Sequence, residues 1–118
     1  MGRDNVVKDK SFEFALKIIE IYKFLIDKNE YIMSKQVLRS GTSIGAMIRE
    51  SEHAESRADF IHKFAVAQKE ANETDYWLDL LYSSRYIPKE IYSSMKNQLR
   101  QLQKLISSII ITTKGRKK

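Results

Sequence analysis

Two long stretches of the sequence carry mostly apolar residues at alternating steps of three and four, and this spacing constrains the fold more than any other feature. In the first stretch the series is Phe60, Phe64, Ala67, Ala71, Thr74, Leu78 and Leu81. In the second it is Tyr92, Met95, Leu99, Leu102, Ile106 and Ile109. Residues at these steps share one side of an α-helix, so each stretch predicts a helix with a long apolar seam.

The sequence predicts four helices, over residues 9–28, 34–55, 57–84 and 88–113. Ser34 is the expected N-cap of the second, and residues 56–59 resemble a capping box at the start of the third. With 118 residues, one proline and four glycines, the chain favours a single all-α domain. Because seams on successive helices with short connections pack together, we expect an antiparallel up-down-up-down four-helix bundle. Residues 114–118 form a basic tail that we expect to be disordered.

Gly41 and Gly45 lie one turn apart within the second predicted helix, where each glycine costs about 1 kcal/mol relative to alanine. Without a Cβ atom at these positions, a neighbouring helix can approach closely. A phosphate cradle would instead require a preceding strand and a Gly-Lys-Ser/Thr sequence, and the chain has neither. The pair therefore predicts tight helix packing.

Two motifs together resemble a known family. RSGTSIGAMIRE at 39–50, followed by DFIHKFAVAQKEANETDYWLDLL at 59–81, resembles the bacterial four-helix-bundle family encoded in intervening sequences of 23S ribosomal RNA genes. That family includes the accessory variability protein of diversity-generating retroelements. The resemblance covers about residues 8–112 and departs at Met47, where a more polar residue is expected. It implies a ring-shaped homopentamer, a basic surface that binds nucleic acid and, in the retroelement case, a reverse transcriptase partner.

Glu70, Glu73 and Trp77 share one stripe of the third predicted helix. Two carboxylates on a half-apolar face can form an acid/base pair, or they can be held by an arginine of a neighbouring helix. Arg39, which lies in the other motif of the resemblance, is the candidate partner. Since no nucleophile or metal set accompanies the two glutamates, structural ion pairing is the preferred interpretation.

No catalytic or metal site is predicted. Glu50 with His53, and Asp59 with His62, have the carboxylate-x-x-His spacing of di-iron bundles, but both motifs flank the same predicted turn. Such a site also needs a mid-bundle carboxylate from each of the other two helices, and the fourth predicted helix offers only Glu90, at its opposite end. The sequence therefore predicts no metal and no cofactor. Cysteine is absent, which fits a reducing cytoplasm. No apolar run in the sequence is long enough to predict a membrane span.

Charge is distributed unevenly along the chain. Residues 1–85 carry 13 basic and 14 acidic side chains, whereas residues 86–118 carry 8 basic and 1 acidic, which gives a net charge of +7. The basic side chains of this end are Lys89, Lys96, Arg100, Lys104, Lys114, Arg116, Lys117 and Lys118. The first four form a ridge on the fourth helix and are expected to face no acid except Glu90. The ridge predicts polyanion binding, with a solvated helix face or an acidic membrane surface as alternatives.

The first predicted helix has more apolar residues than one face requires. Leu16 and Phe24 fall inside its polar arc, so we expect them to contact another subunit.

Together these features predict a non-enzymatic homo-oligomer that docks structured RNA or an RNA–DNA hybrid on its basic end. The alternative is a protein-interaction scaffold, such as a reverse transcriptase accessory subunit. Tyr82, Tyr86 and Tyr92, near the last turn, either stack on bases or close the end of the bundle.

Overall fold

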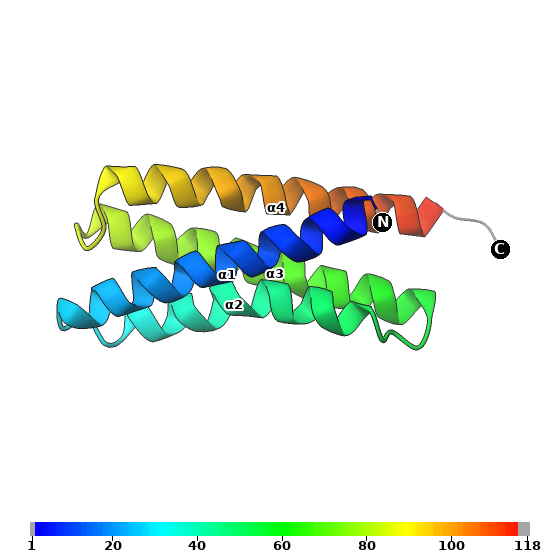
Figure 1. The fold of residues 1–118 in the computed structure, drawn as a ribbon, viewed down its shortest axis with the longest axis horizontal. Helices are drawn as coiled ribbons and strands as arrows, with labels where there is room; N and C mark the ends of the chain where they lie inside the picture. The colour runs from blue at the N-terminus through cyan, green and yellow to red at the C-terminus, as the bar shows by residue number, and fades with distance from the viewer. Residues whose placement is uncertain (1, 116–118) are drawn as a thin grey trace.

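The protein is a bundle of four long helices in the computed structural model, which describes residues 2–115. The helices are α1 (Arg3–Asp27), α2 (Met33–Ser51), α3 (Arg57–Ser83) and α4 (Lys89–Gly115). They lie side by side along the longest of three extents of 52, 22 and 20 Å, and the connections between them alternate between the two ends (Figure 1). No strand occurs in residues 2–115. The prediction of an all-α fold with four helices is confirmed.

The core runs the length of the molecule between the four helices. On α3 and α4 it contains the predicted seams, except that Phe60 and Tyr92 lie at its edge and are only partly buried. On α1 and α2 its fully buried members are Val7, Phe14, Ile18, Leu25, Val37 and Ile44. Each helix packs on two neighbours, and α1 and α4 make the least extensive of these contacts.

α1 and α2 approach closely at Gly41. A Cβ atom at position 41 would lie 2.7 Å from Cγ1 and 2.9 Å from Cδ1 of Ile18, which is fully buried and cannot move aside. At Gly45 the corresponding atom would lie 3.4 Å from the carbonyl oxygen of Ser11. The first glycine is therefore required by packing, and the second leaves room for a methyl group.

One of the two predicted N-caps differs in the structure, and the other is confirmed. Glu30, not Ser34, caps α2: its carboxylate accepts from the backbone N–H groups of Ile32, Met33 and Ser34, at 3.2, 3.0 and 2.6 Å. Ser34 lies inside the first turn with its side chain buried. At α3 the Ser56 hydroxyl accepts from the N–H of Asp59 at 3.0 Å, as in a capping box.

Three helix boundaries also differ from prediction. α1 begins at Arg3 rather than near Asp9, because Val7 is buried in the core and extends the apolar face. α2 ends at Ser51 rather than Glu55, since Glu52, His53 and Glu55 are exposed and bury nothing. α4 includes Lys114 and Gly115, which the sequence predicts to lie in the tail, and residues 116–118 lie outside the described part of the chain.

Replacing Gly41 and replacing Gly45 with alanine should have different effects on the stability of the fold. Gly41→Ala places a methyl group against Ile18, and the overpacking is expected to cost about 1–3 kcal/mol, more than the gain in helix propensity. Gly45→Ala should leave stability unchanged or raise it by up to about 1 kcal/mol. Urea denaturation of both variants measures the difference, and a Gly41→Ala protein as stable as Gly45→Ala would contradict the packing account.

Candidate nucleic-acid interface

A row of basic side chains follows the outer face of α4. At 100° per residue, Lys89, Arg100, Lys104 and Lys114 fall within one arc of the helix, and all four are exposed. Lys89, Lys104 and Lys114 make no ion pair with any side chain that the structure describes. Because α4 rises about 1.5 Å per residue, this row is about 37 Å long. We call these four residues the α4 row.

Lys96, which the sequence placed in the same ridge, is not a free cation. Its ammonium group forms ion pairs with Asp75 and, at 2.7 Å, with Asp79, and its side chain is only 18 % exposed. Arg100 also approaches Asp75, at 3.9 Å, and donates to Gln103 at 2.9 Å. The expectation that the ridge faces no acid except Glu90 is therefore wrong, because α3 supplies two carboxylates.

The ionisation of this cluster reflects its contacts. Burial opposes the charge of Lys96, but the bonds to Asp75 and Asp79 outweigh it and raise the pKa of Lys96 above its usual 10.5. Hydrogen bonds from Lys96 and from the Tyr92 hydroxyl lower the pKa of Asp79 below its usual 3.8. The bond that Tyr92 donates to Asp79 raises the pKa of Tyr92 above 10.0. All three groups keep their charge states at neutral pH.

Further polar contacts continue this pairing along α3 and α4. The Gln68 amide donates to the Ser107 hydroxyl at 2.8 Å, and the Gln103 amide donates to Asn72 at 3.1 Å. These contacts lie on the α3-facing flank of α4, beside the α4 row. They lie between the buried seam of α4 and its solvent-facing cations, and they match the rotation that the seam imposes on the helix.

Acid should weaken the Asp79 contacts. A carboxyl group with a lowered pKa in the folded protein stabilises the fold at higher pH, and this contribution is lost as pH falls through the folded pKa, below 3.8. The free energy of unfolding should therefore decrease more steeply with falling pH in the native protein than in Asp79→Asn. At pH 7 the variant should be less stable by up to about 1 kcal/mol, since the pair is partly exposed.

Denaturation at a series of pH values between 2 and 7 measures this slope. Glu13→Gln is the matched control, because Glu13 is an exposed carboxylate with no ion pair among the described residues. An Asp79→Asn profile that follows the native curve would show that the contact carries no stability.

A second charged cluster joins α2 to α3. Arg39 contacts Glu70 at 3.2 Å and also pairs with Glu73, and the Trp77 indole N–H donates to Glu73 at 3.0 Å. The bonds from Arg39 and then Trp77 lower the pKa of Glu73. A carboxylate held in this way is a weaker base, so the geometry matches a structural ion pair rather than an acid/base pair.

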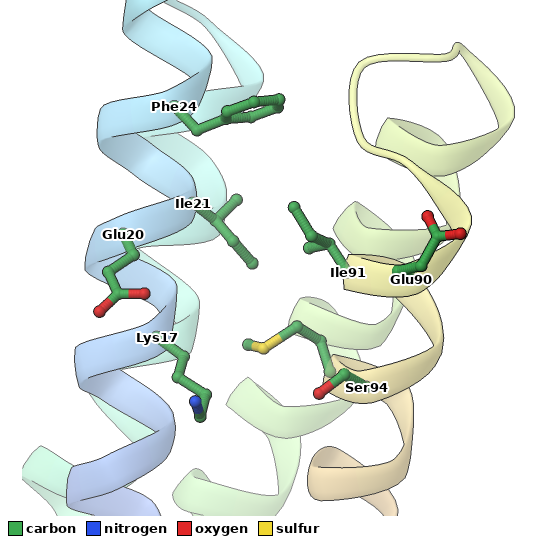
Figure 2. Close-up of a pocket in the computed structure, with 8 residues that line it drawn as sticks. Lys17, Glu20, Ile21, Phe24, Glu90, Ile91 and Ser94 are labelled. Atoms are coloured by element: carbon green, nitrogen blue, oxygen red, sulfur yellow. The ribbon is translucent and has the colours of Figure 1, made fainter.

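An open groove of about 390 Å³ lies between α1 and α4. Figure 2 shows Phe24 and Ile21 of α1 directed across it towards Ile91 of α4. Phe24 is thus partly buried against the core, and the Lys28 ammonium lies 4.8 Å from the centre of its ring. Phe24 therefore has apolar contacts within its own chain, and its contact with another subunit stays a prediction.

Leu16, in contrast, is 49 % exposed. It lies one turn from Phe12, which is 51 % exposed and which the sequence analysis did not single out. Arg49 of α2 covers part of the Phe12 ring at 5.4 Å. Phe12 and Leu16 therefore form a partly exposed apolar surface on α1.

Metal-ligand geometry is not found in the described residues. His53 and His62 are both exposed, and within residues 2–115 no group of three or more His, Cys, Asp or Glu side chains is placed to hold a metal ion. Nor does any helix in that range have the length and apolar character needed to cross a membrane.

These features define a class: a four-helix protein with a basic outer helix. Residues 3–108 match the family model of the 23S rRNA-intervening sequence protein, and the chain belongs to this family. The predicted resemblance is confirmed. The fold is also similar to the crystal structure of a protein with unknown function from the S23 ribosomal protein family of Bacteroides thetaiotaomicron. The two are 60 % identical over 92 % of this chain and 97 % of the other, with a TM-score of 0.90. No curated protein sequence matches the chain.

Proposed function

We propose that the protein is a non-enzymatic, cytoplasmic nucleic-acid-binding protein that docks structured RNA or an RNA–DNA hybrid on the α4 row. Arg116, Lys117 and Lys118, which lie outside the described residues, add three further positive charges at this end of the sequence. Binding is electrostatic and addresses the phosphate backbone, so it provides affinity without base-specific recognition.

The observation that supports this proposal is the separation of free from neutralised cations. Lys96 is held by Asp75 and Asp79 and can contribute little to a polyanion. Lys104 and Lys114 are exposed and unpaired among the described side chains, so their ammonium groups are available to phosphates. The net charge of +7 over residues 86–118 has the sign that such a ligand requires.

We also propose that the antiparallel bundle assembles into a homo-oligomer, a ring of five. The exposed apolar side chains of Phe12 and Leu16 support an interface on α1. Several α4 rows in one assembly would bind a long polyanion by multivalency. The sequence predicted Leu16 and Phe24 for this interface, and we propose Phe12 in place of Phe24.

RNA binding should depend steeply on salt through the α4 row. Removing two cations with Lys104→Gln and Lys114→Gln should reduce the slope of log affinity against log salt by about 0.7–0.9 per contact for each chain engaged. Fluorescence anisotropy with a labelled RNA hairpin, across about 50–300 mM salt, measures the slope.

The matched control removes two exposed lysines of α1, Lys17→Gln and Lys23→Gln, and therefore the same charge. Equal slopes for the two double variants would place binding outside the α4 row. Absence of binding by the native protein at the lowest salt would mean that the row is only a solvated surface.

The proposed interface predicts that charge on α1 disrupts assembly. Phe12→Glu with Leu16→Glu places two carboxylates on the apolar surface and should shift the sedimentation coefficient towards that of a single chain. Asn97→Glu adds a carboxylate to an exposed polar position of α4 and should leave the assembly unchanged. A Phe12, Leu16 variant of native size would exclude this interface.

One observation favours the protein-scaffold alternative. Ile111 is 70 % exposed and lies on the same face of α4 as Lys104, two turns away. An apolar side chain within a basic surface suits a protein partner, such as a reverse transcriptase, better than a phosphate backbone. A co-purifying protein that survives nuclease treatment and moderate salt would support this alternative.

A further inference from the structure

The α1–α2 and α3–α4 connections lie at the same end of the bundle (Figure 1). An open pocket of about 340 Å³ is lined by residues of this end. α1 contributes Phe24, the residue after its end contributes Lys28, and the rest come from the end of α3 and the connection to α4. The lining residues are Phe24, Lys28, Tyr82, Arg85, Tyr86, Ile87 and Pro88. We call this the end pocket.

The end pocket combines aromatic rings with positive charge. Its charged lining residues are Lys28 and Arg85, and none of the described residues that line it is acidic. The nearby Glu30 carboxylate is largely buried and is engaged by the backbone of α2. The lining therefore suits a ligand that has both a planar ring and an anionic group.

Tyr82 presents a fixed aromatic surface to this pocket. Its ring stacks on that of Tyr92, with 4.2 Å between centroids and an angle of 11° between planes. Tyr92 is held in turn by its hydrogen bond to Asp79, at 2.7 Å, and by the Lys96 ammonium, 5.3 Å from its ring centre. Since Tyr82 remains 36 % exposed, a further planar ring can extend the stack.

Arg85 lines this pocket, and its backbone is in a strained conformation. Its φ is 69°, in the left-handed region, and the turn is closed by the N–H of Tyr86, which donates to the carbonyl of Leu81 at 2.8 Å. The turn after α1 has the same conformation with Asn29, a residue that tolerates it, whereas arginine does not favour it. Strain of this kind in a pocket wall points to a role for the side chain.

We propose that the end pocket binds one unpaired nucleotide of a single-stranded nucleic acid, with its base on Tyr82 and its phosphate between Lys28 and Arg85. This inference rests on the proposed function for the source of the strand. Lys89 directly follows Pro88, so the α4 row begins beside the pocket. The row then holds the backbone of a paired region, and the pocket holds an unpaired end or loop base.

The test compares a labelled RNA hairpin that has a single-stranded 3′ overhang with the same hairpin ending blunt, using the full-length chain. Tyr82→Ala should weaken binding of the overhang hairpin by about 5- to 100-fold and leave the blunt hairpin and the salt slope unchanged, because tyrosine is uncharged. Tyr76→Ala, which removes an exposed tyrosine of α3 outside the pocket, is the matched control.

Arg85→Gly separates binding from folding. Glycine adopts the left-handed turn without strain, so this variant should melt at or above the native temperature and still bind the overhang more weakly. If Tyr82→Ala and Arg85→Gly both bind the overhang as Tyr76→Ala does, or if the native protein does not distinguish the two hairpins, the end-pocket proposal is wrong.

Failure of the end pocket and failure of the α4 row can be distinguished. Loss of overhang binding in Tyr82→Ala, together with no effect of the Lys104, Lys114 variant, would retain the pocket and overturn the row. Adenosine 5′-monophosphate is added as a competitor: weak competition at millimolar concentration supports a strand nucleotide. Binding of the free nucleotide as tight as that of the overhang would replace the strand with a soluble nucleotide.

Discussion

The apolar seam shared by the four helices is the constraint on which every other feature depends. Burying one large side chain contributes about 1.5–3 kcal/mol, whereas an exposed ion pair contributes about 0–1 kcal/mol. The seam therefore fixes the rotation of each helix, and the polar side chains take the faces that remain. Gly41 serves the same constraint, because it lets α2 approach the buried Ile18. The α4 row faces solvent because Leu99 and Ile106, on another side of α4, are buried in the core.

At the contact between α3 and α4, helix packing lowers the number of basic side chains that are free to bind a polyanion. Summed along the chain, residues 86–118 are strongly basic. In the fold, Asp75 and Asp79 face Lys96, and one of the basic groups is neutralised. Asp79 also accepts a hydrogen bond from Tyr92, whose ring stacks on that of Tyr82 in the lining of the end pocket. One polar cluster thus positions both proposed binding surfaces.

The proposed surfaces occupy different parts of the molecule. Phe12 and Leu16 belong to α1 on the side where Arg49 of α2 packs. The α4 row lies on the side where α3 packs, beside the Gln103–Asn72 contact. Assembly through Phe12 and Leu16, as proposed, would use residues other than those of the α4 row.

The sequence by itself determined the helices, the seams on α3 and α4 and the capping box at Ser56. These are local or periodic properties, and a helix displays them whatever it packs against. The tertiary structure alone decided that position 41 must be glycine whereas position 45 need not be, that Phe24 rests on the core and that Lys96 meets two aspartates. The matching i, i+4 spacings of Asp75 with Asp79 and of Lys96 with Arg100 were a visible signal. Their pairing depends on the register between two helices, which packing sets and no single stretch of sequence encodes.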